Sequence, residues 1–115
     1  MAEVKHNLQH KTVLDDMLLN DPRITAGKVF GLECYKIEGK VFATLYGDGV
    51  GIKLPAERVE ALKDRAGTEE FRPFNKNRGK NYIQITHADS QALRSEQGLL
   101  MESANFVLKE ASAKK

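Results

Sequence analysis

One stretch in the first half of the chain constrains the fold most, because its apolar residues alternate with the two-residue period of β-strands between glycine-containing turns. It predicts three strands, over Lys28–Ile37, Lys40–Tyr46 and Gly49–Leu54. The connections at 38–39 and 47–49 are short enough for tight turns. Since both faces of these strands carry apolar residues, we predict an antiparallel meander with helices on one face. The other face is expected to be half-buried or part of an interface.

Amphipathic helices are predicted on both sides of the meander. Residues 5–19 carry one continuous apolar face, made up of Val13, Leu14, Met17 and Leu18. Residues 23–27 are interpreted as a linker. A second helix is expected over 55–66, because proline suits the first turn of a helix and Gly67 suits its end.

A later strand and a last helix complete the expected domain. Residues 81–86 are predicted to form a strand that pairs with the meander. After a break near 95–98, apolar residues recur at helical spacing from Leu100 to Ala111. The predicted fold is α+β: one domain over 1–115, with a three-strand meander, one or two later strands and helices packed around the sheet. About residues 1–6 and 112–115 are expected to be loose.

Charge and cysteine content exclude several classes of protein. The net charge is +2, which gives no global reason to expect binding to nucleic acid, membranes or polyanions. A single cysteine, Cys34, cannot form an internal disulfide or a thiolate metal site. No secretory signal is visible, and no apolar run approaches the ~20 residues that span a bilayer. We therefore expect a cytoplasmic protein without a membrane segment.

Several short motifs resemble those of the TfoX N-terminal domain and the related MmcQ/YjbR-like proteins. The motifs that carry the likeness are Lys28-Val29-Phe30-Gly31, Glu38-Gly39-Lys40-Val41-Phe42-Ala43, Ile52-Lys53, the 55–66 helix, Phe71-Arg72-Pro73-Phe74 and Tyr82-Ile83-Gln84-Ile85. The chain departs from the family where Leu32-Glu33-Cys34 replaces a second glycine, and it contains no tryptophan. The resemblance implies a fold like that of type III secretion chaperones and a link to bacterial competence regulation. It supplies no catalytic residues.

A run of basic residues is the strongest candidate binding site in the sequence. Residues 72–80 contain four cations and no acid, and aromatic residues are interleaved or adjacent. Such a segment can grip phosphates while a ring stacks on a base. The candidate nucleic-acid-binding residues are Arg72, Phe74, Lys76, Arg78 and Lys80. The alternative is a solvated hairpin whose phenylalanines anchor in the core.

Other reactive side chains are better explained by structure. His6 and His10 have a spacing that suits a metal, but no third ligand is fixed, which favours an ordinary helix surface and no metal site. His87 and Asp89 fall where a helix cap belongs. Cys34 lies in mid-strand, as a buried and inert cysteine would.

These observations predict a non-enzymatic binding or regulatory module without a cofactor. Its expected partner is another protein, including a second copy of itself. Leu99, Met101 and Phe106 lie outside the apolar face of the last predicted helix, where a partner could contact them. The alternative is nucleic-acid binding through 72–80. An enzymatic reading would need titratable groups from distant segments, such as His87 with Asp48 or Glu33, to converge in one pocket.

Overall fold

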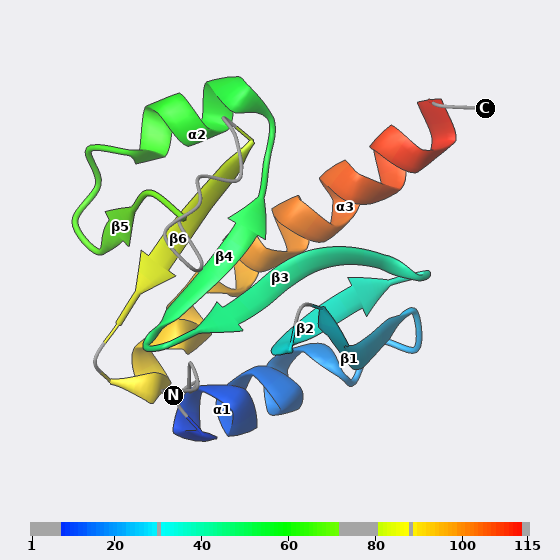
Figure 1. Ribbon diagram of the computed structural model, residues 1–115, viewed down its shortest axis with the longest axis horizontal. Helices are drawn as coiled ribbons and strands as arrows, with labels where there is room; N and C mark the ends of the chain where they lie inside the picture. Colours follow the sequence, from blue (N-terminus) through cyan, green and yellow to red (C-terminus); the bar gives the residue numbers. More distant parts are fainter. Residues whose placement is uncertain (1–7, 30, 72–80, 88, 114–115) are drawn as a thin grey trace.

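The computed structural model describes residues 8–29, 31–71, 81–87 and 89–113 (Figure 1). The fold is α+β: six strands form one antiparallel sheet in the order β1-β2-β3-β4-β6-β5. The strands are β1 (Ile24–Val29), β2 (Leu32–Ile37), β3 (Lys40–Tyr46), β4 (Gly49–Lys53), β5 (Thr68–Glu69) and β6 (Tyr82–Thr86). The helices are α1 (Leu8–Leu18), α2 (Ala56–Leu62), the 3-10 helix η2 (Ser90–Glu96) and α3 (Gln97–Ala113).

The meander has four strands where three were predicted. The single strand predicted over Lys28–Ile37 and the linker predicted over 23–27 are both wrong, because β1 and β2 fold back on each other as a hairpin. The reversal includes Gly31, whose φ of +79° is accessible to glycine at little steric cost. The next turn matches its prediction: Glu38 and Gly39 both have positive φ, as a two-residue hairpin turn of type I′ requires.

The remaining strand pairs agree with the prediction at the level of elements. β3 pairs with β4, and β6 pairs with β4, as expected of a later strand that joins the meander. The side chains of β3 do not alternate strictly between buried and exposed, because the register against β2 shifts between Tyr35 and Lys36. Phe42 and Ala43 are consequently both buried, as at a β-bulge.

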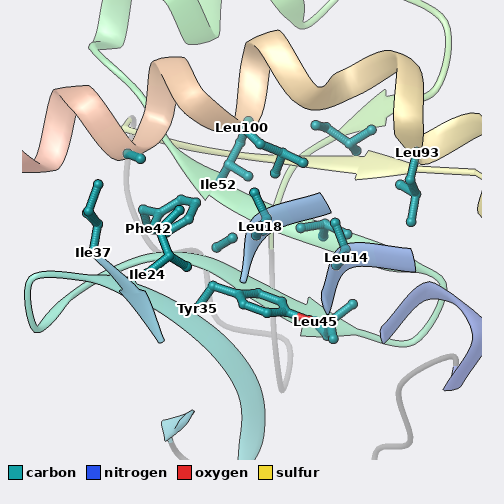
Figure 2. Packing of buried hydrophobic residues seen from close by; sticks show 14 of the residues in the cluster. Leu14, Leu18, Ile24, Tyr35, Ile37, Phe42, Leu45, Ile52, Leu93 and Leu100 are labelled. Carbon is teal, nitrogen blue, oxygen red and sulfur yellow. The ribbon is translucent and has the colours of Figure 1, made fainter. Parts of the chain in front are cut away.

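The helices lie over one face of the sheet and enclose the core (Figures 1 and 2). Leu14 and Leu18 of α1 and Leu100 of α3 pack with the inward residues of the strands, among them Ile52. Val59 and Leu62 of α2 are half-buried against the same cluster. Tyr35 is also fully buried, and its hydroxyl donates to the Asp15 carboxylate at 2.6 Å. Burial, with the nearby Asp15 carboxylate, raises the pKa of Tyr35.

The helix bounds differ from the predicted ones mainly at their ends. α2 stops at Leu62, four residues before the predicted end at 66, and Gly67 takes its positive φ in the turn before β5. The expected break before the last helix is the passage from η2 to α3. No helix among the described residues is long and apolar enough to cross a membrane.

Ser103 allows α3 to approach the sheet closely. Its hydroxyl is fully buried and lies 3.0 Å from the Phe42 carbonyl and 2.6 Å from the Lys53 carbonyl, to which it can donate. It also accepts from the Lys53 N–H at 3.2 Å. Its small side chain therefore ties the middle of α3 to β3 and to the end of β4 at once.

We predict that Ser103→Ala lowers the free energy of unfolding by about 1–3 kcal/mol, because buried backbone groups lose their partner. Urea denaturation measures the change. Ser95→Ala is the matched control, since that hydroxyl is exposed and bonds only locally to the Ala92 carbonyl. Its change should stay within about 0.5 kcal/mol. Equal effects of the two substitutions would contradict the role assigned to Ser103.

Candidate functional site

β1 is an outer strand of the sheet, and among the described residues it has a neighbouring strand on one side only. The Glu38 N–H donates to the Arg23 carbonyl at 2.9 Å, so residue 23 turns its peptide groups toward β2. Because peptide groups alternate along a strand, Ala26 and Lys28 turn theirs outward. Within the described part of the chain, no residue bonds to these outward groups. Such a row of backbone donors and acceptors is a template for another strand.

The side chains of β1 leave room for a neighbouring strand. Thr25, Ala26 and Lys28 are exposed, and Gly27 has no side chain. The aliphatic end of Lys36 lies beside Gly27, 3.4 Å from where a Cβ would stand. Lys28 forms a loose ion pair with Glu33 of β2, at 3.6 Å. The opposite edge strand, β5, has two residues, so β1 offers the longer edge.

Three aromatic rings form a second surface feature, on the sheet face opposite the helices. We call Tyr46, Phe71 and Tyr82 the aromatic cluster: the Phe71 ring centroid lies 6.5 Å from that of Tyr46 and 6.1 Å from that of Tyr82. Gly51 makes this possible, because a Cβ there would stand 2.4 Å from the Phe71 ring. Phe71 is buried, while the two tyrosines are half-buried.

The predicted basic site, Arg72, Phe74, Lys76, Arg78 and Lys80, lies outside the described residues. The residues that flank it are described. Phe71 immediately precedes it, and Tyr82 follows it after Asn81. The two flanking rings are in contact within the aromatic cluster. Lys53 adds a cation here, 5.9 Å from the Tyr82 ring centroid, and its ion pair with Glu110 raises its pKa.

His10 is not on the helix surface, as the sequence analysis expected, but fully buried between α1 and η2. Its Nε2 lies 2.7 Å from the His87 carbonyl, which can only accept, so Nε2 carries a hydrogen. Its Nδ1 lies 2.6 Å from the Ser90 hydroxyl. His6, the other half of the predicted spacing, is outside the described residues. The described residues contain no group of three or more His, Cys, Asp or Glu side chains that could hold a metal ion.

A buried carboxylate joins three connecting segments. Glu96, at the end of η2, is 3% exposed and bonds to Arg65 after α2 and to His87 after β6, the latter at 2.7 Å. Burial raises the pKa of Glu96, but the hydrogen bonds from Arg65 and His87 outweigh it, so the pKa is lowered overall. Asp89 caps η2 by accepting from the Gln91 N–H at 2.9 Å, as the cap interpretation predicted. His87 therefore serves the Glu96 network and is not part of the cap.

The other candidate residues also have structural positions. Cys34 is fully buried, and burial raises the pKa of its thiol, which confirms the expectation of a buried cysteine. Leu99, Met101 and Phe106 are half-buried against the core. A depression of about 580 Å³ runs along α3, and Pro55 and Phe106 are part of its lining.

Comparison of the chain with protein-family models, curated proteins and solved structures found no match. The arrangement of the described residues is therefore the basis for proposing a function.

We predict that the Glu96 network makes stability depend on pH. Because the folded-state pKa of Glu96 lies below its unfolded value of about 4.3, its contribution is complete above that value and is lost as pH falls through the folded pKa. Glu96→Gln should therefore reduce the free energy of unfolding at pH 7 by about 1–3 kcal/mol, with a smaller difference at pH 3.5. Urea denaturation at both pH values measures this.

Glu60→Gln is the matched control, since Glu60 is exposed and pairs only with Lys63. That substitution should change stability by less than about 0.5 kcal/mol at either pH. A loss on Glu96→Gln that is the same at pH 7 and pH 3.5 would contradict the prediction.

Proposed function

We propose that this chain is a non-enzymatic binding module that takes a protein partner by adding a strand to β1. The observation that carries the proposal is the open outer side of β1, where Ala26 and Lys28 present backbone groups that no described residue uses. An extended segment beside β1 would continue the sheet and satisfy these groups. Recognition through main-chain bonds at a sheet edge is a recurring mode of peptide binding.

The size and chemistry of the edge favour a reversible contact. Each new backbone bond contributes about 0.5–1.5 kcal/mol net, and β1 spans six residues. The exposed Thr25, Ala26 and Lys28 side chains add selectivity through the residues placed opposite them. A partner held in this way gains most of its affinity from the backbone and its register from these side chains.

The engagement of reactive side chains in structural bonds supports the non-enzymatic part of the proposal. His10 bonds through both ring nitrogens, and Ser90 is its partner. Glu96 is held by Arg65 and His87. These groups link segments of the fold and therefore have a structural reason to be where they are.

We predict that Ala26→Pro abolishes partner binding, because proline has no N–H to offer on the outer side of β1. The β1–β2 ladder should survive, since the Ala26 N–H points away from β2 and edge strands tolerate proline. Ala26→Ser is the matched control and should bind as the unmodified chain does.

The probe is a displayed library of random peptides, with bound peptides resynthesised and titrated. Far-ultraviolet circular dichroism and urea denaturation establish that both variants fold. Peptides that lose at least tenfold in affinity on Ala26→Pro and none on Ala26→Ser would support strand addition. A library that yields no peptide sensitive to Ala26→Pro would contradict it.

A second candidate function is single-stranded nucleic-acid binding, and one specific observation favours it. Phe71 and Tyr82, which flank the basic run in the sequence, contact each other within the aromatic cluster. Rings beside cations are the combination that holds bases and phosphates without sequence preference. The half-buried Tyr46 and Tyr82 are the rings that keep some exposed surface here.

If this function holds, affinity for a labelled oligonucleotide of mixed sequence should fall steeply with salt. Removing two contacting cations by Lys76→Ala with Arg78→Ala should reduce the slope of log affinity against log salt by about 1.4 for a single strand. Lys40→Ala with Lys63→Ala is the control, since these exposed lysines lie on other segments. Fluorescence anisotropy measures the binding. An unchanged slope, or no binding at low salt, would contradict this second function.

A further inference from the structure

We infer that the strand added to β1 is β1 of a second copy of this chain, running antiparallel, with a two-fold axis at Ala26. This inference rests on the proposed strand addition and names its partner. It would join two six-strand sheets edge to edge into one continuous sheet. The edge is suited to itself because a two-fold rotation pairs its backbone groups, places small side chains at the centre and keeps the two Lys28 charges apart.

The hydrogen-bonding groups of β1 are symmetric about Ala26. Ile24, Ala26 and Lys28 have outward peptide groups, but the Ile24 N–H already donates to the Asp21 carbonyl at 2.9 Å. With the axis at Ala26, the two Ala26 residues exchange a pair of bonds. Each Lys28 N–H then donates to the partner's Ile24 carbonyl, which no described residue uses on that side. The pairing therefore uses every free outward N–H of the strand.

The side chains in this register also fit. Ala26 lies opposite its own copy, where a small exposed side chain gives no clash. Thr25 lies opposite the partner's Gly27, beside the aliphatic end of Lys36 that covers that glycine. Lys28 lies opposite the partner's Ile24, and its ammonium keeps the Glu33 ion pair within its own sheet.

The positions of the two Lys28 side chains favour a two-fold axis at Ala26 over an axis one residue to either side. With the axis at Ala26, the two Lys28 Cα atoms are four residue steps apart, or about 14 Å at ~3.4 Å per step. That distance exceeds the screening length of about 8–10 Å at moderate salt. An axis at Gly27 would bring the two lysines within two steps, or about 7 Å, where they repel. An axis at Thr25 would leave Lys28 beyond the paired region and lose its bonds.

Strand pairing alone buries little surface, so the self-association should be weak and concentration-dependent. Sedimentation velocity from micromolar to millimolar chain should therefore show a reversible monomer–dimer equilibrium. Ala26→Pro should shift it to monomer by at least tenfold in the dissociation constant, and Ala26→Ser should leave it within about twofold.

Cross-linking tests the register directly. Opposed residues of a hydrogen-bonded pair have Cα atoms about 5.5 Å apart, within the range that a disulfide or a short thiol-reactive linker spans. Ala26→Cys should therefore cross-link into a covalent dimer on mild oxidation or with a short bis-maleimide. Lys28→Cys is the matched control: residue 28 is also exposed but lies too far from its copy. The unmodified chain is the blank, because Cys34 is buried.

The outcomes separate this inference from the proposed function. A covalent dimer with Ala26→Cys at least tenfold more abundant than with Lys28→Cys, together with the equilibrium lost on Ala26→Pro, supports self-pairing. Equal cross-linking of the two cysteines, or a monomer at every concentration, overturns it. If peptides still bind the edge in an Ala26→Pro-sensitive way while the chain stays monomeric, strand addition stands and the second copy is the wrong partner.

Discussion

The close approach of α3 to the sheet is the constraint on which the rest of this structure depends. Ser103 fits between the helix and the backbones of β3 and β4, and the apolar layer around Ile52 and Leu100 closes beside it. With α1 and α2 packed against the same layer, the helices cover one face of the sheet. The other face is covered in part by Phe71 lying over Gly51, and β1 has a neighbouring strand on one side only among the described residues. The two proposed binding surfaces lie outside this packed layer: one is the edge strand β1, and the other is the aromatic cluster on the opposite face.

Much of the sheet could be predicted from residue alternation, but the edge that carries the proposed function could not. The strands over 40–46 and 49–54, the tight turn at 38–39 and the later pairing strand all agree with the structure within a residue or so. β1 was missed because Ile-Thr-Ala-Gly-Lys-Val alternates weakly and was divided between a linker and a strand. The residue that could have indicated the β1–β2 hairpin was Gly31. A glycine that can take positive φ fits a chain reversal as well as a β-bulge.

Contacts between distant parts of the sequence account for the other differences. The spacing of His6 and His10 describes a local helix surface, whereas His10 finds its partners 77 and 80 residues away. Glu96 likewise meets Arg65 and His87 through folding of segments that no local pattern connects. Capping at Asp89, in contrast, depends on neighbours in sequence and was predictable. The same distinction holds for Phe71 and Tyr82, whose rings meet only because Gly51 leaves space.

The link from His10 to Ser90 also bears on how this chain folds while it is being made. The ribosome delivers α1 first, and β2 with Tyr35 follows soon after, yet the side chains that receive the other side of α1, including Ser90 and Leu93, are synthesised some eighty residues later. The hairpins of the meander can pair soon after they emerge, since each contact spans few residues. Until η2 and α3 follow, much of the apolar side of that nascent sheet is exposed to water and can take part in misfolding or aggregation. The contact between α1 and η2 is then among the last to form.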